Sequence, residues 1–289
     1  MISQLICKLV NQLGFDIVRR RPKENADFSL YDNFPRESLQ KRNFFNIGAG
    51  SFQHPYWTNV DYATNYYREI QHSPIINYNL MELKPLPIES NVAELVYSSH
   101  TIEHVSDEAI LNLLKESYRI LKSGGGIRLT TDDAALNFKA YKRKDIKFYY
   151  WIDWHSQPGT WEKNFKIPLS SASIHQVFLN IFASQLCEIN MDDSPSKKYS
   201  DPEIIEIFSK YSFVDALDYF TKQCKFNPDH PGNHINWWTD DKLISFLHKA
   251  GFSETYRSGY GQSLFPPLWN TNFFDNTHPK ISLYIEAIK

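Results

Sequence analysis

Two glycines and an aspartate stand at positions that suit a nucleoside ligand. Gly48 and Gly50 follow one short apolar segment, and Asp61 ends the next. Glycine permits a sharp turn and a close approach of the backbone to a ligand, and a carboxylate at the end of a second strand can bind both hydroxyls of a ribose. A dinucleotide would require a third glycine, but Gln53 stands there. The pattern favours a nucleoside without phosphate, with an NAD-type or nucleotide-sugar enzyme as the less favoured alternative.

These residues lie at the ends of apolar segments that we predict to be strands. The predicted strands cover 43–47, 58–61, 75–79, 93–98 and 126–131, with two closing strands at about 254–261 and 281–288. Helices are predicted at 106–121 and 239–250, where apolar residues recur at helical spacing and Ser106 and Thr239 can cap the first turns. Strands that alternate with helices favour a parallel, doubly wound α/β sheet.

Four motifs follow one another at the spacing of successive strands. They are GAG at 48–50, NVD at 59–61, SSHTIEHV at 98–105 and RILKSGG at 119–125. In this order they resemble the class I S-adenosylmethionine (SAM) dependent methyltransferases, and most closely a bacterial branch of that family. Ser123 replaces the usual proline, a change that a turn should tolerate. The ending of the chain, 234–252 and 282–289, is similar to methyltransferases encoded with bacterial surface-polysaccharide genes.

The resemblance implies a methyl-transferring enzyme with SAM as its cofactor. It also implies a Rossmann-like sheet of seven strands whose last strand is antiparallel. The family's cofactor contacts are carried over onto matching positions. Gly48, Ala49 and Gly50 would face the methionyl part, Asp61 would hold the ribose, Asn79 would contact the adenine amino group beside Leu80, and Ser98, Ser99 and His100 would line the sulfonium.

Methyl transfer requires an acceptor aligned with the donor and, for a hydroxyl acceptor, a base. Histidine is the usual base near neutral pH. We favour His100 and Asp132 because they end the predicted fourth and fifth strands, at the edge of the sheet where ligands bind. His155 and His234, from the segment that follows, are further candidates.

The order His-x-x-Glu-His, formed by His100, Glu103 and His104, also suits a metal. It is similar to the inverted zinc-protease motif. The motif nevertheless directly follows a core strand and belongs to the methyltransferase pattern. We therefore expect no metal, and expect Glu103 and His104 to orient the loop through hydrogen bonds.

Two aromatic stretches, 151–161 and 227–238, combine tryptophan with histidine, aspartate and asparagine. Tryptophan faces and polar groups suit a sugar, whereas a tryptophan-rich lid packed on the sheet is the alternative. A deep cleft lined by Trp154, Trp237 and the histidines would favour a sugar, and a narrow apolar slot would favour a small metabolite. With the similarity of the ending, this predicts O-methylation of a sugar, sugar phosphate or glycan-linked group. Two alternatives stay open, namely methylation of an unrelated small metabolite and an inactive SAM-fold protein that binds a partner.

The composition limits the partners. Of 289 residues, 42% are hydrophobic and 22% charged, as in a globular protein. The formal net charge of -2 gives no electrostatic reason to expect nucleic acid, so we expect a small-molecule or glycan acceptor. Three distant cysteines and no long apolar run predict a cytoplasmic protein.

We divide the chain into four parts. Residues 1–40 form an amphipathic helix and linker, 41–135 the SAM-binding core, 136–236 a mostly helical aromatic insertion that caps the substrate, and 237–289 the completion of the sheet. The N-terminal helix, followed by three arginines, is expected to pack on the core or on a second subunit of a homodimer. Peripheral membrane association is the alternative.

Overall fold

The computed structural model describes residues 27–67, 71, 74–195 and 197–289. The predicted N-terminal amphipathic helix, with its expected contact to a membrane or a second subunit, lies outside the described residues. In the part that is described, no helix is both long and apolar enough to cross a bilayer.

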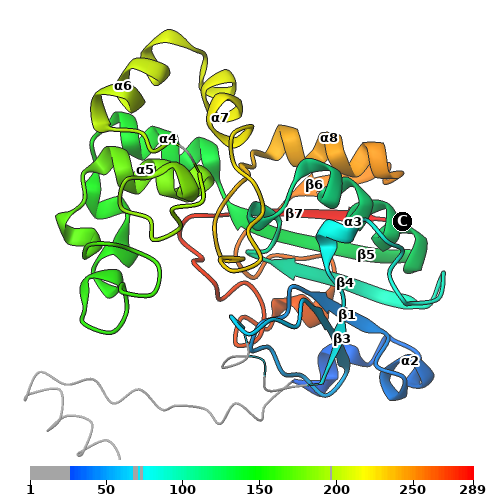
Figure 1. Ribbon diagram of the computed structural model, residues 1–289. Coiled ribbons are helices and arrows are strands. Elements are labelled where there is room, and N and C mark those ends of the chain that lie inside the picture. The colour runs from blue at the N-terminus through cyan, green and yellow to red at the C-terminus, as the bar shows by residue number, and fades with distance from the viewer. Residues whose placement is uncertain (1–26, 68–70, 72–73, 196) are drawn as a thin grey trace, which may run out of the picture.

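A seven-stranded sheet forms the centre of the molecule (Figure 1). Its strands are β1 (Phe44–Ile47), β2 (Trp57–Asp61), β3 (Ile75–Asn77), β4 (Ala93–Ser99), β5 (Leu121–Asp132), β6 (Glu254–Arg257) and β7 (Ser282–Ile288). They lie in the order β3-β2-β1-β4-β5-β7-β6. The pairs among β1 to β5 are parallel, whereas β7 is antiparallel to both of its neighbours. The predicted Rossmann-like sheet with an antiparallel last strand is therefore confirmed.

The direction of winding changes between β1 and β4. From β1 the chain proceeds outward through β2 and β3, and then returns to pair β4 with the other side of β1. Ligands of open parallel sheets bind at such a point, outside the carboxyl ends of the strands. The turn after β1 and the residues after β4 are thus the positions on which a site is built.

One face of the sheet is covered by α3 (Asp107–Ile120) and α8 (Asp240–Ala250), which pack together (Figure 1). Their caps are those predicted, because the Ser106 side chain accepts a hydrogen bond from the Ala109 N–H and the Thr239 side chain accepts one from the Lys242 N–H. Their apolar residues join the main core with those of the strands.

The opposite face is covered by short turns rather than by long helices. Tyr31, from η1 (Phe28–Tyr31), and Leu268, from η9 (Pro266–Trp269), pack with Phe274 against the strand residues Phe44, Trp57, Leu95 and Tyr97. Among the described residues, the only α-helix that accompanies these turns is the short α2 (Arg36–Gln40). The expected alternation of strand and helix fails between β1 and β2, where 48–56 form turns. Its aromatic side chains, such as Phe52, fill the space that a helix would occupy.

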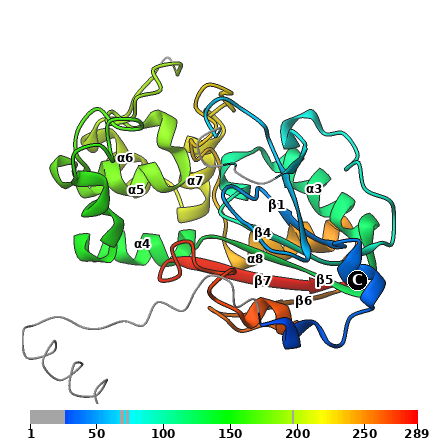
Figure 2. The ribbon, with the colours of Figure 1, turned by 90° about the horizontal axis from the view of Figure 1, so that it is seen from below.

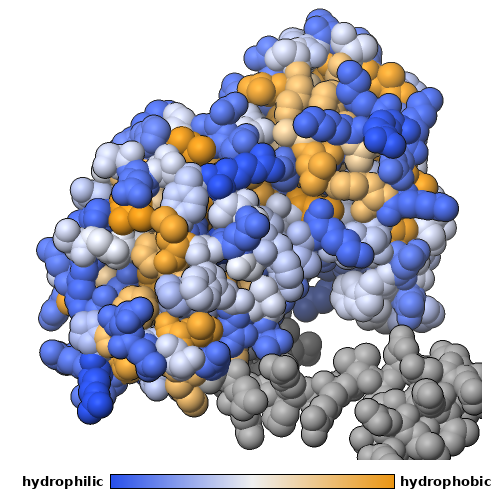
Figure 3. Space-filling model, turned by 180° about the vertical axis from the view of Figure 1, so that it is seen from behind, coloured by the Kyte–Doolittle hydropathy of each residue, from blue (hydrophilic) through white to orange (hydrophobic). Residues whose placement is uncertain are grey.

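Four helices lie to one side of the sheet (Figure 2). They are α4 (Ala134–Lys142), α5 (Ile174–Ala183), α6 (Asp201–Lys210) and α7 (Phe213–Thr221), joined by 3-10 turns at Ile146–Phe148, Tyr150–Ile152, Trp154–Ser156, Leu169–Ser171 and Ser184–Leu186. They bury an apolar cluster of their own. The surface seen in Figure 3 mixes hydrophilic and apolar side chains. On the four helices, the apolar residues Ile205 of α6 and Val214 of α7 are about half exposed.

A buried arginine fixes the far edge of the sheet. Arg128 of β5 is fully buried and pairs with two equally buried carboxylates, Asp275 and Glu286. Its remaining N–H groups donate to the Ser258 hydroxyl and to the Gln262 and Gly259 carbonyls. All five guanidinium donors are thus used, which binds β5 to β7 and to the loop after β6.

Replacing this arginine should destabilise the fold strongly. Arg128→Met leaves two buried carboxylates without their cation, so we expect the free energy of unfolding to fall by about 3–5 kcal/mol. Urea unfolding followed by circular dichroism measures it. Lys41→Met is the control, because the Lys41–Glu37 pair is exposed to solvent and its loss should leave the free energy of unfolding almost unchanged. Equal effects of the two substitutions would contradict the role given to Arg128.

Candidate functional site

A cavity of about 940 Å³ lies at the carboxyl ends of β1, β2 and β4. Its wall includes the glycine turn after β1, in which Gly48 has φ +71° and Gly50 has φ +53°. A Cβ at Gly48 would lie 2.1 Å from Oγ1 of Thr101, whereas one at Gly50 would project into open space. The turn therefore needs glycine at both positions, at Gly48 because of Thr101 as well as φ and at Gly50 because of φ.

Asp61 faces this turn. Its Oδ2 accepts a hydrogen bond from the Gly50 N–H at 2.7 Å, and its Oδ1 accepts one from the Tyr62 N–H at 2.7 Å. Burial raises the pKa of the carboxyl group, and hydrogen bonds from the Gly50 and Tyr62 N–H groups and from the Gln71 side chain oppose that rise. A carboxylate has about four lone-pair positions, so Asp61 keeps acceptor capacity for a ligand hydroxyl at the cavity wall.

Most of the other predicted cofactor residues also line this cavity. They are Ala49, Asn79, Leu80, Ser99 and His100. The Asn79 side chain accepts a hydrogen bond from the Met81 N–H and so caps η2 (Leu80–Glu82). Its amide hydrogens remain as donors.

Ser98 is the exception. It is 1% exposed and is absent from the cavity wall, while its neighbours Tyr97 and Ser99 line it. Successive side chains of a strand point to opposite faces, so Ser98 of β4 lies on the other side of the sheet. Ser98 and Ser99 are adjacent and chemically identical, so their type alone does not show which of them faces the cavity.

The larger cavity fits an adenosyl group better than a pyrophosphate. No helix begins at the glycine turn, so the helix N-terminus that holds phosphate in dinucleotide sites is missing there. Among the described residues, the wall contains neither lysine nor arginine. Bare backbone and one carboxylate suit a nucleoside without phosphate, in agreement with the preference drawn from Gln53.

A smaller cavity of about 230 Å³ adjoins the larger one and shares Tyr66, His100, His104, Gly232 and Thr277 with it. It lies between the ends of β4 and β5 and helix α5. All four predicted catalytic residues, His100, Asp132, His155 and His234, line it. The structure thus brings together residues that are up to 134 positions apart in the sequence (234 − 100).

His100 has both ring nitrogens engaged. Its Nε2 lies 2.8 Å from the Ser282 hydroxyl and its Nδ1 lies 3.1 Å from Oε1 of Glu103. Burial alone would lower the pKa of His100, but the neighbouring carboxylate of Glu103 raises it overall. The residue also has φ +48°, an uncommon conformation held by a bond from its N–H to the Thr130 carbonyl. A ring whose two nitrogens both face partners within the protein is a poorer base than the sequence suggested.

His104 and His234 instead present free nitrogens. Nδ1 of His104 lies 3.1 Å from the Asn233 carbonyl oxygen, and Nδ1 of His234 lies 2.7 Å from that of Ile181. Because a carbonyl oxygen only accepts, each Nδ1 carries a proton, and Nε2 is the nitrogen that bears the lone pair when the ring is neutral. Burial, reinforced by His104, lowers the pKa of His234 to about 4, so this ring is neutral at pH 7.

Asp132 is a carboxylate at the end of β5 within the smaller cavity. Burial raises its pKa to about 7, and the charges of Glu103 and Asp133 add to the rise, while His100 opposes it. Its Oδ2 lies 3.6 Å from Nδ1 of His234. A carboxyl group with this pKa can take up a proton near neutral pH, and it lines the smaller cavity.

Trp154 and Trp237, whose presence in the acceptor cleft would have favoured a sugar, line neither cavity. Trp154 is 59% exposed, and Trp237 is buried in the core of the insertion, with its Nε1 donating to Asp218. Trp151 and His278 line the smaller cavity instead. His278 belongs to the loop before β7 and carries no local pattern, so only the fold could reveal it.

Comparison with known proteins identifies the chemistry. Residues 53–129 match the family model described as "Methyltransferase domain". The match runs from the segment before β2 into β5 and includes Asp61 and the residues after β4. The chain is a methyltransferase, and its cofactor is SAM. No curated protein matches it.

Solved structures of similar fold are also SAM-dependent methyltransferases. One from Thermotoga maritima, described as a possible histamine N-methyltransferase, is 14% identical over 99% of each chain, with a TM-score of 0.39. One from Mesorhizobium loti is 12% identical over 92% of this methyltransferase and 99% of that chain, with a TM-score of 0.40. One from Archaeoglobus fulgidus is 10% identical over 85% of each, with a TM-score of 0.38. At these identities the likeness does not bear on the acceptor.

The role of Asp61 can be tested through cofactor binding. Asp61→Asn keeps the size of the side chain but removes its charge, and bonds to a charged group are worth about 1.5–3 kcal/mol. We expect the affinity of the methyltransferase for S-adenosylhomocysteine, measured by isothermal titration calorimetry, to fall about 10- to 100-fold. Asp153→Asn, at an exposed residue of the insertion, should leave it unchanged. Unchanged affinity in Asp61→Asn would show that this carboxylate does not hold the ribose.

Proposed function

We propose that the enzyme methylates a hydroxyl group of a sugar, or of a group linked to one, bound in the smaller cavity. The observation that carries this proposal is a pair of buried polar atoms in the cavity-lining residues. His155 Nδ1 and Asn180 Oδ1 have no hydrogen-bond partner within the described protein. Leaving a buried polar atom unsatisfied costs about 1–3 kcal/mol. A polyhydroxylated acceptor could satisfy both, because a hydroxyl both donates and accepts.

The composition of the wall supports the same acceptor class. Four amides line the smaller cavity, from Asn164, Asn180, Asn190 and Asn233, and the aromatic rings of Trp151 and Phe165 accompany them. Amides bind hydroxyls, and flat rings pack on the C–H faces of sugars. Its volume is below the roughly 300–1,000 Å³ of drug-sized pockets, so it suits a single ring or the end of a longer glycan.

The reaction divides between the two cavities. SAM supplies an electrophilic methyl group on its sulfonium. Asp61 and the glycine turn hold the nucleoside at the larger cavity, and the smaller cavity holds the acceptor oxygen near the residues that both share, His100 and His104. Asp132 takes the proton of the hydroxyl as the oxygen attacks, because it is a buried carboxylate on the acceptor side.

A panel of acceptors tests the proposal. The enzyme, first shown by calorimetry to bind SAM, is incubated with SAM labelled in the methyl group and with mono- and oligosaccharides, sugar phosphates and small non-sugar metabolites. We expect label only in products with a new methyl ether on a sugar. Transfer solely to non-sugar metabolites would overturn the acceptor class, and SAM binding without any transfer would favour the inactive partner-binding alternative.

Asn180→Leu should impair acceptor use and leave cofactor binding intact. The substitution replaces the amide oxygen and nitrogen by two methyl groups in a side chain of the same branched shape, so we expect kcat/KM for the sugar to fall about 10- to 100-fold, equivalent to roughly 1.4–2.8 kcal/mol. The affinity for S-adenosylhomocysteine serves as the internal control and should not change. A variant with unaltered kcat/KM would place the acceptor elsewhere.

Asp132→Asn tests the base. The amide keeps the shape of the carboxylate but cannot take a proton, and a positioned base contributes about 10²–10⁴-fold. We expect kcat to fall within this range while KM for SAM stays the same. Full activity in Asp132→Asn would remove this residue from the mechanism.

A further inference from the structure

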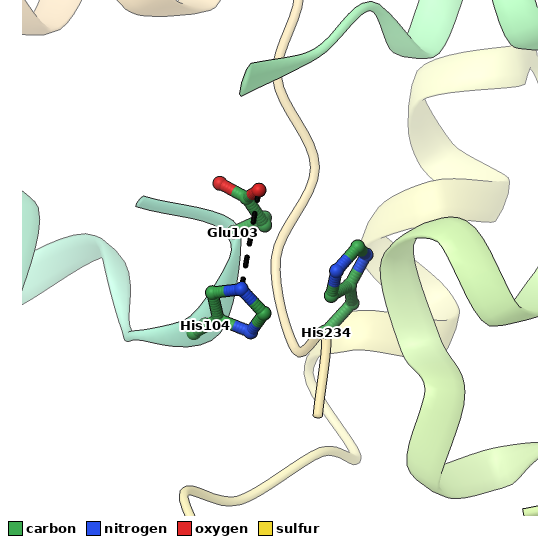
Figure 4. Close-up of side chains that lie close together, drawn as sticks. All are labelled: Glu103, His104 and His234. Carbon is green, nitrogen blue, oxygen red and sulfur yellow. Dashed lines mark ion pairs between the residues drawn. The ribbon is translucent and has the colours of Figure 1, made fainter. Parts of the chain in front are cut away.

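We propose that Glu103, His104 and His234 bind a divalent transition-metal ion in the wall of the smaller cavity (Figure 4). The sequence led us to expect no metal, because the motif of His100, Glu103 and His104 directly follows a core strand and belongs to the methyltransferase pattern. The fold turns His100 toward Ser282 and brings in His234 from 130 residues beyond His104 (234 − 104).

The distances between the ligand atoms of the three side chains suit a shared metal ion better than direct hydrogen bonds. One ligand atom from each of the three side chains lies within 4.8 Å of the others. Nε2 of His104 is 4.0 Å from Oε1 of Glu103, which is too far for a hydrogen bond. Ligand atoms that each lie about 2.0–2.2 Å from one zinc ion can be separated by up to about 4 Å. A small contraction of the cluster would bring all three to an ion.

Both histidines are already oriented as ligands. Metal-binding histidines nearly always donate their second ring N–H to a carbonyl or carboxylate, which fixes the tautomer and the ring. His104 donates its Nδ1–H to the Asn233 carbonyl and His234 donates its Nδ1–H to that of Ile181. The two rings lie 4.7 Å apart, between centroids, in an edge-to-face arrangement. These backbone contacts orient the two rings so that Nε2 of each is the nitrogen that can bind an ion.

An independent observation is the state of Glu103. Its side chain is 1% exposed. Its Oε2 accepts a hydrogen bond from the Thr131 hydroxyl, whereas its Oε1 receives no aligned hydrogen bond, although His100 Nδ1 lies 3.1 Å away. A second carboxylate, Asp132, is buried in the same cavity. A buried carboxylate is costly unless it is paired or binds a metal. Glu103 is next to His100, but its Oε1 lacks an aligned hydrogen bond and can still receive an ion. A doubly charged ion would also offset the charge of Asp132.

The donor set selects the kind of ion. Imidazole nitrogen suits zinc, iron, cobalt and similar ions, whereas magnesium and calcium prefer oxygen ligands. Three protein ligands leave one position open, as in catalytic sites. An oxygen of the acceptor would occupy that position and be held toward the methyl donor. This last role rests on the proposed function, but the metal site does not.

Cobalt titration tests the site without acceptor or cofactor. Protein stripped with EDTA is titrated with Co²⁺ at pH 7 and followed by its visible absorption and by calorimetry, and the protein as purified is analysed for metal by mass spectrometry. We expect one Co²⁺ per chain, and binding at least tenfold weaker in Glu103→Gln, His104→Ala and His234→Ala. His230→Ala, in the same cavity but outside the cluster, should bind Co²⁺ like the unchanged protein.

Folding of each variant is verified by its circular dichroism spectrum and by urea unfolding, because His104 also lines the larger cavity and cofactor affinity is therefore not an independent control. The absence of saturable Co²⁺ binding, or equal binding in the folded His104→Ala and His234→Ala variants, would overturn the site. These outcomes differ from a failure of the proposed function. If the protein binds cobalt through these residues but methylates no sugar, the proposed acceptor class is wrong and the proposed metal site stands.

Discussion

The buried carboxylate of Glu103 is the constraint on which the arrangement of both cavities depends. It lies just after β4 and must be compensated where water cannot reach it. Its side chain accepts a hydrogen bond from the Thr131 hydroxyl of β5, and its backbone carbonyl oxygen accepts hydrogen bonds from the N–H groups of Ile235 and Asn236. The segment that returns from the insertion is thereby joined to the edge of the sheet. His234 is brought beside His104 as a consequence.

Two kinds of environment meet at this junction. On one side, the glycine turn and Asp61 form a cavity with bare backbone, one carboxylate and, in the described part of its wall, no lysine or arginine. On the other side, amides, histidines and Asp132 form a smaller and more polar cavity. His100, held in an uncommon backbone conformation, stands where the two meet. Methyl transfer requires such an arrangement, because donor and acceptor must approach along one line.

The parts that sequence predicted well are those decided by neighbouring residues. Gly48, Gly50 and Asp61 were identifiable because strand ends, positive φ and a carboxylate are local properties. The helix caps Ser106 and Thr239 were identifiable for the same reason. Ser98 was misplaced because strand alternation was not applied to it. Sequence alone could not show whether Trp154 and Trp237 reach the cleft, since tryptophan occurs both in apolar cores and at the surface. The orientation of His234 depends on Ile181, and no local pattern could link them.

The most direct test of this account is a crystal structure of the enzyme with bound SAM. We predict that the ribose hydroxyls will contact Asp61, that the methionyl part will lie along the glycine turn, and that the sulfonium methyl group will face the opening beside His100 and His104. A cofactor whose ribose does not contact Asp61, or whose methyl group points away from the smaller cavity, would contradict it.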